Sequence, residues 1–170
     1  MTLFLIFITS VLNAQALTPG EANELTMQDC IHEDSIDFDW EDSNTGILTT
    51  ICELGFILGR QTVITSNHRE SSSGQHKHAN AWDFYYSYEG IVGKCEVVKQ
   101  YKEDVNSMID WLDAVGWDEV TGFGVYPFMI VMHLDFRGRK SRWAFDSEKR
   151  EINFQEGLDQ LDRLIDRECG

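Results

Sequence analysis

The sequence predicts an α+β domain with a small antiparallel sheet flanked by helices. Stretches with helical and with alternating spacing of apolar residues follow one another with short gaps, which is typical of this class. The chain has 170 residues, enough for one domain with a proper core and too few for two. A hydrophobic share of 42% and an aromatic share of 12% indicate a globular protein.

The first half of the domain reads as one helix followed by two strands. Apolar residues recur at roughly helical spacing over 46–60, where Gly59 supplies a stop. Residues 61–66 then read as a strand, and 67–75 as a loop. The aromatic-rich stretch 83–88 is predicted to be the second strand, closed by a turn at residues 89–90.

Two helices are predicted in the second half. One has its apolar face between residues 105 and 115 and stops near Gly116, and the other covers 148–168. The apolar stripe of the last helix consists of Phe154, Leu158, Leu161 and Ile165. Between the two helices, the glycine-containing stretch 122–127 is interpreted as a turn-rich bend.

A strand is predicted over 130–136, where apolar and polar residues alternate. Side chains two residues apart lie on the same side of a strand. The strand therefore turns Met132 and Leu134 toward the core, while His133 and Asp135 point together to the opposite side.

The N-terminus resembles an export signal. Residues 3–12 are apolar but too few to span a bilayer, and the small-x-small pattern at 14–16 suits a signal-peptidase cut. We expect a signal peptide over 1–16, an acidic lead-in over 17–45 and the functional domain over 46–170. The mature chain would be periplasmic or secreted and would lack a membrane span. A buried first strand or helix is the alternative for the apolar run.

Charge and cysteines constrain the partners and the compartment. The formal net charge is −15, which repels nucleic acid and anionic lipid, so neither is an expected partner. The four cysteines are widely spaced and include no C-x-x-C pair. In an exported protein they permit two disulfides, with three possible pairings.

Two imidazoles and a carboxylate form a candidate metal site: His76, Asp83 and His133. Zinc prefers imidazole nitrogen and also accepts a carboxylate oxygen. Three protein ligands leave one tetrahedral position for water, as hydrolytic zinc sites require. The alternative is that the three residues hold no metal and are two surface histidines and a capping aspartate.

The sequence around these residues resembles the M15 family of zinc peptidases. The resemblance is carried by Ile64-Thr-Ser-Asn-His-Arg69, by His76-x-x-Ala-x-Ala-x-Asp83, and by Tyr126-Pro followed by His133-Leu-Asp-Phe-Arg137 and Trp143. That family comprises D-alanyl-D-alanine carboxypeptidases and murein endopeptidases, and it shares its metal-site scaffold with the Hedgehog signalling domain. The resemblance implies a hydrolase that cleaves peptidoglycan peptides of the cell wall.

The resemblance also implies roles for single residues. His76, Asp83 and His133 would be the zinc ligands. Arg69 would hold a substrate carboxylate through a two-pronged guanidinium contact, with a structural ion pair as the alternative. Ser66 would support the loop, and Asp135 would orient a ligand or an arginine. Trp143 is predicted to belong to the core.

The chain departs from the family pattern at several positions. The family glycine between the first two ligands is Ala79, and Asn67-His68 replaces Gly-Tyr before the arginine. Ile130 occupies the position where many members carry the carboxylate of the general base, so the catalytic base stays unassigned. His68 and His78 add imidazoles near the motif, most simply as solvated side chains. The sequence predicts a zinc metallopeptidase, with a catalytically inactive, zinc-stabilised binding module as the alternative.

Overall fold

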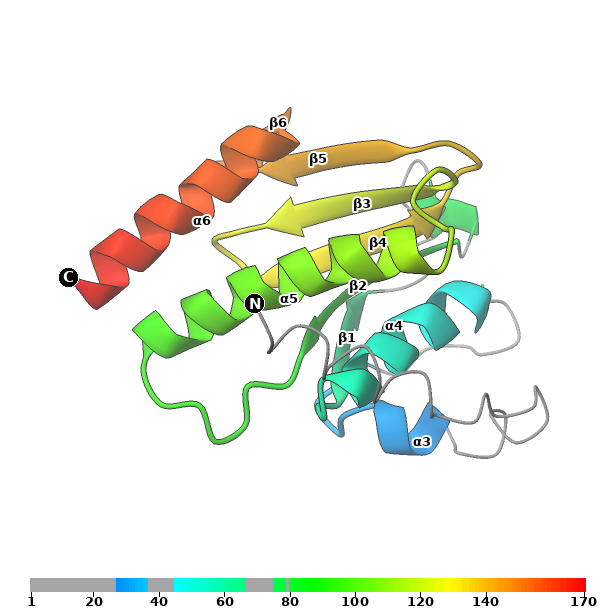
Figure 1. The fold of residues 1–170 in the computed structure, drawn as a ribbon, viewed down its shortest axis with the longest axis horizontal. Coiled ribbons are helices and arrows are strands. Elements are labelled where there is room, and N and C mark those ends of the chain that lie inside the picture. Colours follow the sequence, from blue (N-terminus) through cyan, green and yellow to red (C-terminus); the bar gives the residue numbers. More distant parts are fainter. Residues whose placement is uncertain (1–26, 37–44, 67–74, 79) are drawn as a thin grey trace, which may run out of the picture.

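The computed structural model describes residues 27–36, 45–66, 75–78 and 80–170 (Figure 1). The predicted signal peptide, Arg69 and most of the predicted loop over 67–75 lie outside these ranges. Within them, no helix has both the length and the apolar character needed to cross a bilayer.

The described part of the chain contains one six-stranded mixed sheet with the order β1-β2-β4-β3-β5-β6. Neighbouring strands are antiparallel, as predicted, except that β3 and β5 are parallel. The chain reverses its direction between β3 and β4 and again between β4 and β5. The strand β5 therefore runs in the same direction as β3, which it pairs with on the side away from β4. The strands are β1 Thr62–Ser66, β2 Ala81–Tyr86, β3 Thr121–Tyr126, β4 Val131–Phe136, β5 Ser141–Phe145 and β6 Glu151–Asn153.

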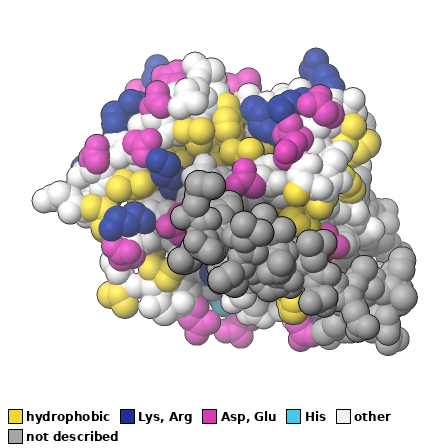
Figure 2. Space-filling view, in the orientation of Figure 1, with side chains coloured by type: hydrophobic (Ala, Val, Ile, Leu, Met, Phe, Trp, Pro, Cys, Tyr) yellow, Lys and Arg dark blue, Asp and Glu magenta, His cyan; other side chains and the backbone are white. Residues whose placement is uncertain are grey.

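The helices lie mainly on one face of this sheet (Figure 1). The helical elements are α3 Met27–Cys30, α4 Thr45–Ile57, the 3-10 helix η1 Gln75–His78, α5 Lys94–Ala114 and α6 Phe154–Cys169. Seen from the helix side, acidic and basic side chains are interspersed over the surface (Figure 2). The predicted α+β architecture with helices flanking a sheet is confirmed.

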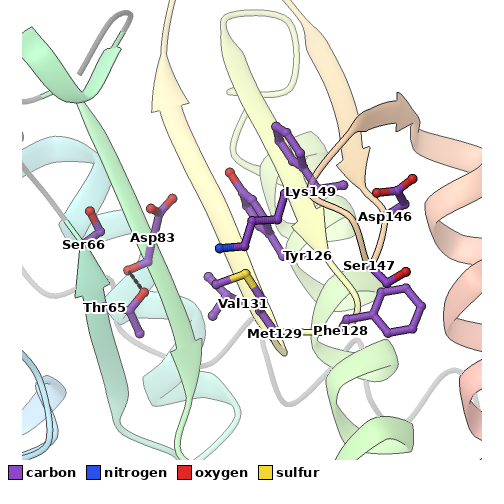
Figure 3. A pocket seen from close by; sticks show the side chains of 11 residues that line it. Thr65, Ser66, Asp83, Tyr126, Phe128, Met129, Val131, Asp146, Ser147 and Lys149 are labelled. Atoms are coloured by element: carbon purple, nitrogen blue, oxygen red, sulfur yellow. Dashed lines mark hydrogen bonds between the residues drawn. The ribbon is translucent and has the colours of Figure 1, made fainter. Parts of the chain in front are cut away.

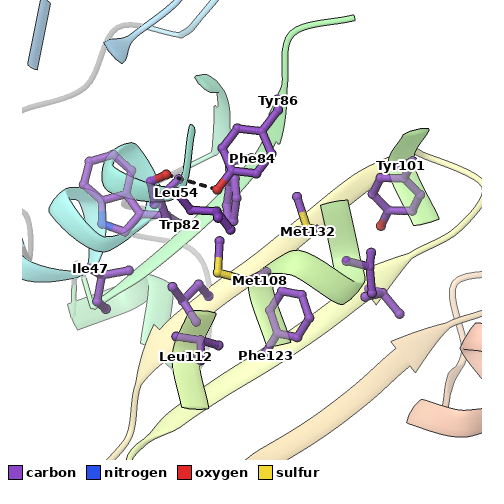
Figure 4. Packing of buried hydrophobic residues seen from close by; sticks show 14 of the residues in the cluster. Ile47, Leu54, Trp82, Phe84, Tyr86, Tyr101, Met108, Leu112, Phe123 and Met132 are labelled. Atoms are coloured by element: carbon purple, nitrogen blue, oxygen red, sulfur yellow. Dashed lines mark hydrogen bonds between the residues drawn. The ribbon is translucent and has the colours of Figure 1, made fainter. Parts of the chain in front are cut away.

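The hydrophobic core lies between the sheet and α4, α5 and α6 (Figure 4). Phe84, Phe123 and Met132 enter it from the sheet, and Ile51 and Met108 enter it from α4 and α5, all fully buried. Because side chains alternate along a strand, the residues between these positions point to the opposite face. The candidate metal ligands lie on that second face.

The predicted bend over 122–127 is wrong, because Thr121–Tyr126 form β3 between β4 and β5. Phe123 and Val125 point into the core, and Gly122 and Gly124, which alternate with them, face the other side. A Cβ on Gly124 would lie 2.5 Å from the indole of Trp143, and one on Gly122 would lie 2.4 Å from Arg137 Nε. These glycines therefore let side chains cross over β3.

The last predicted helix begins six residues later than expected. Glu151–Asn153 pair with β5 as β6, and α6 starts only at Phe154, with the Asn153 side chain accepting from Glu156 N at 2.8 Å. This asparagine satisfies one of the free N–H groups of the first turn. Of the predicted stripe, Leu161 is buried, while Phe154 and Leu158 are partly buried against the core.

The other elements agree with the prediction to within shifts of their ends. The helix α4 and the strand β1 lie where they were expected. The strand β2 covers 81–86 instead of 83–88, and α5 starts at Lys94, earlier than its apolar face indicated.

Two disulfides join the helices: Cys30–Cys52 and Cys95–Cys169. The first links α3 to α4, and the second links the start of α5 to the end of α6. The backbone of His32 also donates to Thr62 O at 2.9 Å, so residues 27–36 of the predicted lead-in are attached beside β1. Disulfides of this kind indicate an oxidising compartment.

We predict that the longer disulfide loop contributes more to stability. The Cys95–Cys169 bond closes a separation of 74 residues and Cys30–Cys52 one of 22. Loop-closure entropy then gives about 4 kcal/mol for the first and about 3 kcal/mol for the second. Urea unfolding of the paired serine variants measures both losses. A larger loss for Cys30→Ser with Cys52→Ser would contradict the entropic account.

We further predict that Gly124→Ala destabilises the sheet by about 1–3 kcal/mol, because the new methyl group meets Trp143. In a Trp143→Ala background the same substitution should cost less than about 1 kcal/mol, since the clash is gone. Urea unfolding of the four chains of this double-mutant cycle measures the difference. Equal costs in both backgrounds would show that the indole is not the obstacle.

Candidate metal centre

The pairing of β2 with β4 places two of the predicted ligands side by side. Asp83 and His133 are direct partners across the two antiparallel strands, and both point away from the helices. His133 Nδ1 and Asp83 Oδ1 lie 2.7 Å apart. Both residues are buried, with 7% of Asp83 and 5% of His133 exposed.

The third predicted ligand reaches the pair from η1. His76 Nε2 lies 3.2 Å from His133 Nδ1 and 3.3 Å from Asp83 Oδ1. The two imidazole rings meet edge to face, with their centroids 4.9 Å apart. The structure therefore brings His76, Asp83 and His133 together, as a group of ligand atoms that could hold a metal ion.

The donor set fits zinc. Three tetrahedral ligands at zinc-bond lengths lie about 3.3 Å from one another. Both distances from His76 Nε2 match this spacing. The hydrogen-bonded His133–Asp83 pair, at 2.7 Å, would open by about 0.6 Å to receive the ion. Two nitrogens and one oxygen are also ligands that zinc accepts in hydrolytic sites.

Asp135 fixes the orientation of His133 from behind. Its Oδ2 lies 3.0 Å from His133 Nε2, and its Oδ1 accepts from Arg137 Nε at 2.7 Å. Asp135 is fully buried. A carboxylate on the outer nitrogen of a histidine holds the ring so that the other nitrogen faces the metal. The family resemblance implied that Asp135 orients a ligand or an arginine, and the structure places its carboxylate against both His133 and Arg137.

Trp143 covers this arrangement instead of joining the core, so the prediction of a core tryptophan is wrong. It is half-buried on the site face, where its ring lies 5.2 Å from that of His133. The Arg137 guanidinium lies 4.5 Å from the centre of the indole. No role was predicted for Arg137, although this residue continues the alternation that begins with His133 and Asp135.

Burial and hydrogen bonding have opposite effects on the pKa values of Asp83 and Asp135. Burial favours the neutral form of Asp83, but hydrogen bonds and charge from His133 and His76 outweigh it and hold its pKa below the usual range. For Asp135, burial is likewise outweighed by Arg137 and His133, so its pKa is also lowered. Both side chains are therefore carboxylates at neutral pH.

The pKa values of the two basic partners of these carboxylates, His133 and Arg137, are raised. Burial alone would lower the pKa of His133, but hydrogen bonds to Asp135 and Asp83 raise it. The hydrogen bond to Asp135 raises the pKa of Arg137. The pairs are thus complementary in charge.

A groove of about 600 Å³ opens beside the ligands (Figure 3). Asp83 and Ser66 line it on one side, where Thr65 Oγ1 donates to Asp83 O at 3.1 Å. Tyr126 and Phe145 line it further along, with stacked rings 4.9 Å apart. Its volume lies in the range of small-ligand sites.

No described residue lining this groove offers a free carboxylate as a proton acceptor. Its acidic residues are Asp83, which belongs to the ligand group, and Asp146, which pairs with Arg150. Ile130, at the family position of the base, lies in the turn between β3 and β4 and packs against the core. His68 and the side chain of His78 lie outside the described part of the chain.

Searches of protein families, curated proteins and solved structures found no match to this chain.

We predict that Asp135→Asn weakens zinc binding by about 10- to 100-fold, because the amide no longer holds the outer nitrogen of His133 as a carboxylate does. Competition with a chromophoric zinc chelator measures the affinity. Asp118→Asn is the matched control, since Asp118 is a buried carboxylate that pairs with Arg142 and lies in the turn before β3, outside the metal group. Equal zinc affinities in the Asp135 variant and the unmodified chain would rule out this role.

Proposed function

We propose that this chain is a zinc-dependent hydrolase that cleaves an amide bond in peptidoglycan stem peptides or cross-links, as a carboxypeptidase or an endopeptidase. The observation that carries the proposal is the convergence of His76 Nε2, Asp83 Oδ1 and His133 Nδ1 beside the groove. The resemblance of the three motifs to M15 peptidases supplies the reaction and the substrate class.

Each residue of the site has a task in this proposal. His76, Asp83 and His133 hold the ion, and Asp135 keeps His133 in its ligating orientation. Zinc, when bound, lowers the pKa of water and polarises the scissile carbonyl. The groove positions the peptide, and Arg69 remains the predicted partner of a substrate carboxylate.

The compartment supports the same proposal. Two disulfides indicate an oxidising environment, and peptidoglycan lies outside the cytoplasm. The expected signal peptide over 1–16 would deliver the chain there. The formal net charge of −15 disfavours nucleic acid and anionic lipid surfaces as partners.

A zinc-stabilised binding module is the second candidate. It is favoured by the apolar Ile130 and by the lack of a free carboxylate among the described groove residues. In such a module the metal would contribute only folding energy, and the groove would bind a peptide without cleaving it.

Digestion of purified peptidoglycan tests the proposal. We expect the zinc-loaded chain to release stem-peptide fragments, whose masses identify the cleaved bond. His133→Ala and His76→Ala should release none, because each removes a ligand. His32→Ala is the matched control, since His32 lies beside Asp34 and not in the metal group.

An unchanged wall in the presence of a folded chain with one tightly bound zinc would overturn the hydrolase proposal and support the binding module. Circular dichroism and metal analysis of the same samples establish folding and zinc content. Fragments released equally by the His133 variant would show that the activity does not come from this site.

A further inference from the structure

We propose that Lys149 binds a carboxylate of the peptide that occupies the groove and so makes the site selective for anionic peptides. This inference deepens the proposed function and rests on it for the identity of the peptide. It assigns a specificity-determining role to a residue outside the three motifs.

Lys149 is the only cation among the described residues that line the groove. Its side chain extends over the groove, and its ammonium points toward the side on which Asp83 lies (Figure 3). Arg150 takes the neighbouring carboxylates of Asp146 and Glu148. In the described part of the chain no ion pair occupies the Lys149 ammonium, which leaves it available to a ligand.

The turn between β5 and β6 holds Lys149 in place. The Asp146 side chain accepts from the backbone N–H groups of Glu148 and Arg150 at 2.8 and 2.9 Å, and from Arg150 Nε at 2.8 Å. Lys149 N also donates to Asp146 O at 3.0 Å. Four hydrogen bonds thus fix a five-residue turn, so the lysine is presented from a defined backbone.

Lys149 adopts a backbone conformation that favours glycine. Its φ is +61°, in the left-handed region, which side chains with a Cβ rarely enter. Ile130, with φ +56°, is the other described non-glycine residue with positive φ, and it directly precedes Val131 in the groove wall. Strained backbone of this kind gathers at binding sites. A lysine at this position is explained by its ammonium and not by the turn.

The rest of the groove indicates the ligand. The stacked rings of Tyr126 and Phe145, together with Met129 and Val131, offer apolar surface for the body of a peptide. The chain as a whole carries a formal charge of −15 and repels anions. A cation aimed into the groove gives a local attraction for a carboxylate, which peptidoglycan stem peptides carry.

Peptide binding tests this role without any need for hydrolysis. The probes are N-acetyl-L-Ala-γ-D-Glu-L-Lys(acetyl)-D-Ala-D-Ala and the same peptide with both carboxylates converted to amides. Titration calorimetry is run on the zinc-loaded full chain and on the chain treated with a chelator. The variants are Lys149→Gly, Lys149→Arg and, as the matched loss of one distant positive charge, Lys99→Gln, which lies on α5.

We expect the unmodified chain to bind the carboxylate peptide about fivefold more tightly than the amide. Lys149→Gly should clearly reduce the preference, with Arg69 still available to one of the two carboxylates, whereas Lys149→Arg and Lys99→Gln should keep it in full, and added salt should reduce it. The melting temperature of Lys149→Gly should be equal or higher, because glycine relieves the positive φ. Lost binding therefore cannot be ascribed to unfolding.

The two proposals fail in different ways. A preference of the same size in Lys149→Gly and in the unmodified chain, or none in the unmodified chain, would overturn the role of Lys149 even if the wall is digested. A chain that leaves the wall intact but shows a Lys149-dependent preference would overturn the hydrolase and leave the carboxylate site standing.

Discussion

The antiparallel pairing of β2 with β4 sets Asp83 opposite His133, and the whole metal centre depends on this register. Side chains alternate along a strand, so a slip by one residue would turn His133 and Asp135 into the core and Met132 and Leu134 out of it. The core prevents that slip, because Met132 and Leu134 are fully buried beneath the helices. Hydrophobic packing on one face therefore fixes the geometry of the polar group on the other.

The charges of this polar group suit a site that could hold a cation. Asp83 and Asp135 are buried carboxylates, and Arg137 donates to Asp135. Hydrogen bonds to Asp135 and Asp83 raise the pKa of the buried His133 imidazole, which favours its protonated form between the two carboxylates. Zinc would supply positive charge at a site where two histidine nitrogens and one carboxylate oxygen already lie close together.

The sequence could predict features that depend on a local pattern of residues, but not those that depend on contacts with distant parts of the chain. The strand around His133 could be predicted from the sequence, because alternating apolar and polar residues show which side chains share a face. The bend predicted at Gly122 and Gly124 was wrong, because these glycines make room for Trp143 and Arg137, whose side chains cross β3 from later in the chain. The strict alternation of these glycines with Phe123 and Val125 was the available sign of a strand. The sequence alone could not indicate Lys149, because the residues that form the groove with it, such as Asp83 and Tyr126, come from distant parts of the chain.

The two candidate functions differ in the fate of one proton. Both need the three ligands and the groove, but only a hydrolase needs an acceptor for a proton from water. The carboxylates near the described site are committed: Asp83 to the ligand group, Asp135 to His133 and Arg137, and Asp146 to the turn. If the chain is a hydrolase, none of these three carboxylates is uncommitted, and the imidazoles of His68 and His78 are two further groups that the sequence offers beside the candidate metal site.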